Sequence, residues 1–338
     1  MKKFLSLIFI VALSLGVMAG CTNDNSNESD QSQKEQPQQQ QESIEINVVA
    51  PQGAPTLSMI KMMKEKPSLG ENIEVNYESV ESPDVIASKL TSNEVDIAII
   101  PTNLAATLYN KDVKYKLVGA NVWGILYLAS DKELNSINDL KGETISTIGR
   151  GLTPDVVFRY ILSKNDIDPE KDLEIKYYNG GTELASSLIA GKDSVAVVPE
   201  PMLSKVLLKN NNIKVNLNIQ DEWSKATGLE GGYPQACLVV SEKLIEENPK
   251  AVEAFINEFE KSIDWVNQNP TQAGDYSEEL ETGIDAKMLE TGIERSNLKF
   301  VNAKDSKESI ENYFNILFEY SPKLVGGKLP DEDFYYTK

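Results

Sequence analysis

A run of β-branched hydrophobic residues followed by a helical pattern occurs twice in the chain. Residues 95–109 read VDIAIIPTNLAATLY, and residues 194–208 read SVAVVPEPMLSKVLL. In each copy the run ends at a proline, Pro101 or Pro199, and apolar residues then recur three or four positions apart. Short β-branched runs are typical of buried strands, and the wider spacing is typical of amphipathic helices. Each segment is therefore predicted to form a buried strand, a sharp turn and a helix.

The similarity between the two copies extends to the residues before them. NVVAPQGAPT, around Gly53, has a counterpart in ISTIGRGLTP, around Gly151, and the two glycines are as far apart as Pro101 and Pro199. Two copies of one long unit predict two similar α/β lobes, whereas a solenoid needs three or more short repeats. In open α/β sheets the ligand site lies outside the carboxyl ends of the strands. The pattern therefore predicts a two-lobed protein that closes on a small molecule.

The N-terminal residues differ from the rest in composition. Two lysines precede an apolar run, Phe4–Val17. As a helix this run extends about 20 Å, which is shorter than the roughly 30 Å hydrocarbon core of a bilayer. Residues 1–20 are therefore predicted to be a secretory signal peptide and not a stable membrane span.

The segment after this run resembles the acylation site of a lipoprotein. Met18–Cys21 resembles a bacterial lipobox, in which the cysteine is acylated, for example with palmitate, and becomes the mature N-terminus. The alternative is an ordinary signal peptide with an incidental cysteine. The following residues, up to Ser43, include no aliphatic or aromatic side chain, so they cannot bury enough surface to offset the entropy of ordering. Residues 21–43 are predicted to be lipidated Cys21 and a disordered polar tether.

Composition excludes several classes of function. The formal net charge of −19 disfavours a nucleic-acid partner, because phosphates are held by Lys and Arg. The chain has no histidine and two cysteines, Cys21 and Cys237. This composition excludes three features: common zinc and haem sites, Ser-His-Asp or Cys-His catalysis, and internal disulfides. We therefore predict no catalytic residue, metal or cofactor, and we predict that Cys237 is a small buried hydrophobic residue.

Polar residues follow the predicted strands of the first copy. The turn after the first strand contains Gln52, Gly53 and Thr56. Glycine allows close backbone approach there, and amides at the start of the next helix could hold an anionic or carbonyl group. Ordinary helix capping explains the same residues. Thr102 and Asn103 follow the next strand and are expected either to cap a helix or to contact a ligand.

The order of these motifs resembles a known family. A strand, a Gly-rich turn and a helix are followed by VDIAIIPTN, a crossover strand, INDLKGETISTIGRGLTPD and VAVVPEPML. This order resembles the substrate-binding proteins of ABC importers, in particular the nitrate, sulfonate and taurine group, which includes binders of thiamine pyrimidine precursors. The resemblance covers roughly residues 44–269 and implies an α/β, two-lobed type II periplasmic-binding-protein fold. It implies crossover strands near 124–129 and 234–240, lobe I at 44–126 plus 237–338, and lobe II at 127–236.

The predicted second lobe contains four candidate ligand-binding residues. Arg150 and Thr153 lie on the counterpart of the first Gly-rich turn. A guanidinium there suits a sulfonate, carboxylate or phosphate, and the alternative is a solvent-exposed loop arginine. Asn179 precedes another helix. Glu200 suits a ligand with an amino or ring N–H donor.

Aromatic residues lie near both predicted crossovers. Trp123 precedes the first crossover and Tyr233 precedes the second. Both are candidates for stacking on a flat ligand, and the alternative is that they pack in the hydrophobic core.

The resemblance implies a function without catalysis. It implies a monomeric, lipid-anchored solute-binding protein on the extracytoplasmic face of the membrane that passes a small molecule to an ABC permease. Its ligand is a sulfonate-, nitrate- or taurine-like anion or a pyrimidine-like ring. One alternative is an enzyme like the pyrimidine synthases, which depend on histidine and cysteine. Another is a sensory or surface lipoprotein with the same fold.

Overall fold

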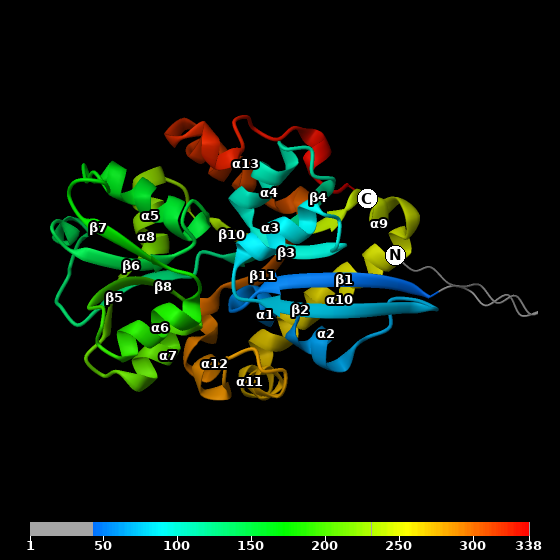
Figure 1. Ribbon diagram of the computed structural model, residues 1–338, viewed down its shortest axis with the longest axis horizontal. Coiled ribbons are helices and arrows are strands. Elements are labelled where there is room, and N and C mark those ends of the chain that lie inside the picture. Colours follow the sequence, from blue (N-terminus) through cyan, green and yellow to red (C-terminus); the bar gives the residue numbers. More distant parts are fainter. Residues whose placement is uncertain (1–42, 231, 338) are drawn as a thin grey trace, which may run out of the picture. The chain divides into compact units, whose positions relative to one another are not determined.

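The computed structural model describes residues 43–230 and 232–337. The predicted signal peptide, Cys21 and the tether up to residue 42 lie outside the described residues. None of the helices in the described ranges combines the length and the apolar composition that crossing a bilayer requires. Figure 1 shows two sheets, each with helices on both of its faces.

The first sheet has six strands in the order β11-β4-β10-β3-β1-β2. β1 is parallel to both β2 and β3, whereas β10 is antiparallel to both β3 and β4, and β11 is antiparallel to β4. The strand bounds are β1 Ile44–Pro51, β2 Ile73–Val80, β3 Ile97–Pro101, β4 Tyr115–Trp123, β10 Pro234–Ser241 and β11 Leu298–Asn302.

The second sheet has five strands in the order β7-β6-β8-β5-β9. β6 is parallel to β7 and β8, and β5 is antiparallel to β8 and β9. The strand bounds are β5 Leu126–Ser130, β6 Thr144–Ile148, β7 Glu174–Tyr178, β8 Val195–Pro199 and β9 Lys214–Asn218.

The two sheets share one topology. The order β10-β3-β1-β2 in the first corresponds strand by strand to β5-β8-β6-β7 in the second, and in each case the first strand of the four is antiparallel to the other three. Pro101 and Pro199 end the equivalent strands β3 and β8. The predicted duplication of an α/β unit is therefore confirmed.

Helices follow the strands and cover the sheets. α5 and α8 pack together on one side of the second sheet, and α6 and α7 pack together on the other (Figure 1). The longest helix, α10, packs against α1, α2 and β11. The helix bounds are α1 Ala54–Ser58, α2 Ile60–Glu65, α3 Pro83–Thr91, α4 Thr102–Tyr109, α5 Thr153–Lys164, α6 Gly181–Ile189, α7 Met202–Lys209, α8 Ile219–Thr227, α9 Glu242–Glu247, α10 Pro249–Gln268, α11 Pro270–Glu279, α12 Ala286–Gly292 and α13 Ala303–Tyr320; the 3-10 helices are η1 Ile137–Leu140, η2 Ile293–Ser296, η3 Pro322–Val325 and η4 Glu332–Phe334.

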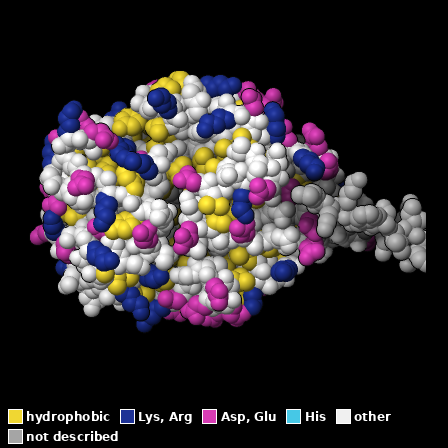
Figure 2. Space-filling model, viewed as in Figure 1, with side chains coloured by type: hydrophobic (Ala, Val, Ile, Leu, Met, Phe, Trp, Pro, Cys, Tyr) yellow, Lys and Arg dark blue, Asp and Glu magenta, His cyan; other side chains and the backbone are white. Residues whose placement is uncertain are grey.

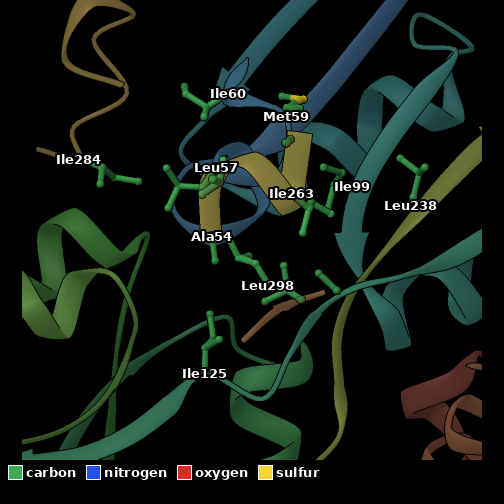
Figure 3. Packing of buried hydrophobic residues seen from close by; sticks show 14 of the residues in the cluster. Ala54, Leu57, Met59, Ile60, Ile99, Ile125, Leu238, Ile263, Ile284 and Leu298 are labelled. Carbon is green, nitrogen blue, oxygen red and sulfur yellow. The ribbon is translucent and has the colours of Figure 1, made fainter. Parts of the chain in front are cut away.

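A continuous hydrophobic cluster holds the first sheet to its helices. Leu57 of α1, Ile60 of α2, Ile99 of β3 and Ile263 of α10 belong to this cluster, and all four side chains are fully or almost fully buried (Figure 3). Burial of a side chain of this size contributes about 1.5–3 kcal/mol. Packing of this kind fixes the helix starts that follow β1, and with them one wall of the site described below.

Acidic side chains are distributed unevenly on the face shown in Figure 2. On the face shown in Figure 2, acidic side chains gather along the lower edge, over α11 and α12, while basic and acidic side chains alternate elsewhere. The described residues therefore offer no continuous basic surface on this face.

Candidate ligand-binding site

A cavity of about 120 Å³ lies where the carboxyl ends of equivalent strands from the two sheets meet. From the first sheet it is lined by the residues after β1 and β2 and by the end of β3. From the second it is lined by the residues after β6, β7 and β8. The lining residues are Pro51, Gln52, Gly53, Ala54, Pro55, Glu81, Pro83, Pro101, Ile125, Ile148, Gly149, Leu152, Pro154, Asn179, Gly180, Gly181, Thr182, Glu183, Pro199, Glu200, Met202, Gln235 and Ala236.

The first-sheet wall of the cavity depends on Gly53. Its φ of 101° lies in a region that side chains rarely adopt, and a Cβ there would meet no atom within 4 Å. Glycine therefore lets β1 turn sharply into α1 while leaving open space at the turn. Gln52 lines the same wall. The structure thus brings two of the sequence-predicted residues, Gln52 and Gly53, to the cavity.

Glu200 lines the opposite wall and is held by a polar network. Its side chain is fully buried, and its Oε1 accepts from Arg295 Nε at 2.6 Å and from Ser204 Oγ at 3.0 Å. Its Oε2 accepts from the backbone N–H of Ser204 at 3.0 Å, which caps the start of α7. Burial raises the pKa of the Glu200 carboxyl, although the Arg295 charge opposes this shift. Glu200 is therefore largely engaged by the protein itself.

Arg295 reaches Glu200 from a distant part of the chain. It belongs to η2, which follows α12, and its Nη2 also donates to Ser204 Oγ at 2.9 Å. The approach is close enough that a Cβ on Gly292 would clash with Ser204 Oγ. The segment from α12 to η2 is thereby pinned to α7.

Gln235 is a buried acceptor beside the cavity. It lies in β10, its residue is only 7% exposed, and its Oε1 has no hydrogen-bond partner among the described residues. A buried acceptor without a partner is uncommon and costs free energy. The Gln235 Oε1 atom is therefore available to accept a hydrogen bond from an N–H or O–H donor.

Asn179 also lines the cavity, whereas three predicted residues support the surrounding loops instead. Thr56 Oγ1 donates to the Pro51 carbonyl at 2.7 Å. Asn103 Nδ2 donates to the Gly151 carbonyl at 2.9 Å, and Thr153 Oγ1 donates to Asn103 Oδ1 at 3.3 Å. Asn103 thus ties the turn after β3 to the loop after β6. Thr102, the neighbour of Asn103, is fully buried and does not line the cavity either.

The remaining three predicted residues lie outside the cavity. Arg150 is exposed, and its guanidinium lies 4.9 Å from the centre of the Tyr177 ring, so it matches the alternative of an exposed loop arginine. Trp123 donates from Nε1 to the Lys299 carbonyl at 3.0 Å and lines a different groove. Tyr233 is fully buried and packs against Trp223 with the ring centres 5.5 Å apart. Tyr233 is therefore a core residue.

Cys237 behaves as predicted. It is buried and free, and burial raises the pKa of its thiol to about 12. A thiol with such a pKa is not a nucleophile at neutral pH.

Sequence reasoning missed Glu81, Gln235 and Arg295. Glu81 follows β2, as Asn179 follows the equivalent strand β7, so the duplication could have pointed to it. Gln235 lies at the start of the predicted return crossover, which was a usable signal. Arg295 has no such signal, since its contact with Glu200 joins residues far apart in the sequence.

Comparisons with known proteins agree with this geometry. A crystal structure of an ABC transporter from Parabacteroides distasonis is 27% identical, covers 88% of this chain and 100% of its own, and superposes with a TM-score of 0.72. The periplasmic aliphatic sulphonate binding protein SsuA of Escherichia coli is 11% identical, with 87% and 92% coverage and a TM-score of 0.68, and so supports the fold alone.

A relative of similar length is found in Bacillus subtilis (strain 168). It bears the name "Putative binding protein YtlA" and is 23% identical over 231 residues, which is 67% of each chain. Residues 70–273, more than half of the chain, match the family described as NMT1/THI5 like. The chain therefore belongs to the NMT1/THI5-like family and has the two-lobed fold of periplasmic binding proteins.

Proposed function

We propose that the protein is the extracytoplasmic solute-binding component of an ABC importer. The observation that carries the proposal is the cavity, which is enclosed by the carboxyl ends of equivalent strands from two sheets of one topology. Such sites are the usual ligand positions in open α/β folds. The ABC transporter protein from Parabacteroides distasonis supports the same function, and the sulphonate binding protein of Escherichia coli supports the fold on which it rests.

The proposed lobes follow the two sheets except at the crossovers, where β5 and β10 each extend past a proposed boundary. Lobe I comprises residues 44–126 plus 237–338, and lobe II comprises residues 127–236. The chain passes between the sheets between β4 and β5 and again between α8 and β10. Two such connections suit a hinge, and a ligand that contacts both lobes favours their closure by its differential affinity.

The residues proposed to contact ligand are Gln52, Gly53, Asn179 and Glu200 from the sequence, together with Gln235. They surround a volume slightly smaller than the cavity of about 150 Å³ that holds benzene in an engineered protein. The ligand is therefore about the size of one small ring with a few substituents. In this proposal the ligand is bound and released without chemical change.

Membrane anchoring completes the proposal. Cys21, outside the described residues, is proposed to carry the lipid that keeps the protein at the membrane beside its permease, and the protein is proposed to act as a monomer. The folded part of the protein then needs only a polar tether to stay within reach of the permease, and the polar composition up to residue 43 fits such a tether.

A cavity-blocking variant tests the function. Thr182 lines the cavity at the start of α6, and Ser186 lies exposed one turn later on the same helix. A thermal-shift screen of small metabolites on the wild-type protein should give a ligand that Thr182→Trp no longer binds and that Ser186→Trp still binds. Equal binding by Thr182→Trp would place the ligand elsewhere, and steady conversion of the ligand by the purified protein would favour an enzyme.

A further inference from the structure

The charged residues that line the cavity are all acidic. Among the described lining residues, the charged side chains are Glu81, Glu183 and Glu200, and no lysine or arginine is included. Glu200 is neutralised by Arg295. Glu81 and Glu183 are both exposed at the cavity and have no basic partner among the described residues. The described residues that line the cavity therefore carry a net negative charge.

Two of the helix starts at the cavity, those of α6 and α7, already carry carboxylates of the chain. The N-terminal end of α7 is capped by Glu200, whose Oε2 accepts from the Ser204 N–H. At α6, Glu183 lies in the first turn and accepts from the Asn179 N–H at 3.2 Å. The partial positive charge of a helix start favours one anionic group. The partial positive charges of these two helix starts are thus already paired with carboxylates, and an oxyanion placed at either start would be repelled.

The two exposed carboxylates belong to segments that touch across the cavity. Glu81 follows β2 of the first sheet, and Glu183 follows β7 of the second. A Cβ on Gly180 would lie 3.3 Å from the Glu81 carbonyl oxygen, so the backbones of the two segments are in contact. A positive charge between them would be attracted from both sheets, whereas without it closure brings like charges together.

An independent observation gives the ligand a second group. Gln235 Oε1 is buried, lacks a partner and lines the same cavity. A ligand N–H would satisfy it, whereas a nitrate or a deprotonated sulfonate has no donor to offer.

We infer that the natural ligand is a small cationic amine or amidine of about one ring. One of its N–H groups donates to Gln235 Oε1, and its positive charge lies toward Glu81 and Glu183. This inference rests on the proposed function, because it assumes that the cavity is the solute site. It separates this protein from the solved relative in Escherichia coli, whose name gives an aliphatic sulphonate as its ligand.

Matched probes test the charge. Benzamidine, benzamide and benzoate share one ring and differ in charge, so thermal shifts of the purified full chain can rank them at equal millimolar concentration. The expected order is benzamidine above benzamide, with no shift from benzoate. Glu81→Gln and Glu183→Gln are each expected to weaken benzamidine about two- to fivefold, as for an exposed ion pair. Gln235→Leu should weaken it by about tenfold or more.

The control is Glu74→Gln, an exposed residue of β2 that does not line the cavity, which should leave benzamidine binding unchanged. The inference is overturned if benzoate binds more tightly than benzamidine, if all three probes give equal thermal shifts, or if none of them gives a shift. It is also overturned if Glu81→Gln and Glu183→Gln leave benzamidine binding unchanged. A neutral or anionic metabolite that binds the wild-type protein and not Thr182→Trp would overturn the inference while leaving the solute-binding function in place. Absence of any binder in the metabolite screen overturns both.

Discussion

Removal of the Arg295 side chain is expected to destabilise the protein through Glu200. In Arg295→Met the carboxyl of Glu200 stays buried between α7 and η2 but loses its charged partner at 2.6 Å. It keeps the two hydrogen bonds from Ser204. Met preserves much of the apolar volume of the arginine stem, so the change acts mainly on charge.

The magnitude follows from how buried each partner is. Loss of one partner from a fully buried ion pair costs about 3–5 kcal/mol. Here the Arg295 side chain is 34% exposed, although Glu200 is 0% exposed. Solvent screening and the two remaining hydrogen bonds reduce the expected loss to about 2 kcal/mol at pH 7. Protonation of Glu200 also relieves the penalty, so the loss should be smaller at pH 5.

The assay is urea unfolding at both pH values without added ligand, followed by tryptophan fluorescence. A double-mutant cycle with Glu200→Gln isolates the pair, since a neutral amide does not need the arginine; the expected coupling is roughly 1–2 kcal/mol. Arg150→Met is the matched control and should stay within about 0.5 kcal/mol of the wild type, because Arg150 is exposed. A loss below about 0.5 kcal/mol for Arg295→Met, or an equal loss at pH 5 and pH 7, would refute the reasoning.

Three further outcomes are expected. The folded-state pKa of Glu200 is raised above the usual value of 4.5, so the contribution of Glu200 to folding stability is favourable below that value and is lost as pH rises. Relative to Glu200→Gln, the wild type should therefore lose stability above about pH 4.5, by at most about 1.4 kcal/mol per pH unit. Urea titrations across pH would measure this loss. Gly292→Ala should destabilise the protein by about 1–3 kcal/mol in the same assay, because the new Cβ clashes with Ser204; an unchanged midpoint would mean that η2 shifts freely. Cys21→Ser should release the protein from membranes into the medium, as fractionation and immunoblotting would detect, and persistent membrane association would contradict lipid anchoring.

Most of the fold could be predicted from local patterns. The β-branched runs that end at Pro101 and Pro199 became β3 and β8, and their matching surroundings predicted one topology in both sheets. Local patterns work here because strand, turn and helix each follow from neighbouring residues. The antiparallel β9 and β11 at the sheet edges had no such pattern, since pairing at an edge is decided by distant strands.

The site was only partly predictable, because sequence patterns indicate where strands and turns lie but not which residues a side chain contacts. Gln52, Gly53, Asn179 and Glu200 lie at strand ends and reach the cavity. Arg150 lies on an equivalent loop but turns outward to Tyr177, and nothing in the order of residues distinguishes these two directions. Tyr233 is as close to a crossover as a ligand contact would be, yet its ring completes an aromatic core with Trp223.

The turns after the equivalent strands β3 and β8 both form contacts that bear on the proposed closure of the two lobes. After Pro101, Asn103 donates to the Gly151 carbonyl of the loop after β6; after Pro199, Glu200 accepts from Arg295 of η2. Both contacts join residues that lie far apart in the sequence, and both flank the cavity without depending on a ligand. In the proposed closure, the free energy of these contacts adds to that of a ligand that bridges the sheets, because all of them contribute to one equilibrium. A ligand of few atoms can then be retained with modest contacts of its own, since part of the stability of the closed arrangement comes from the protein.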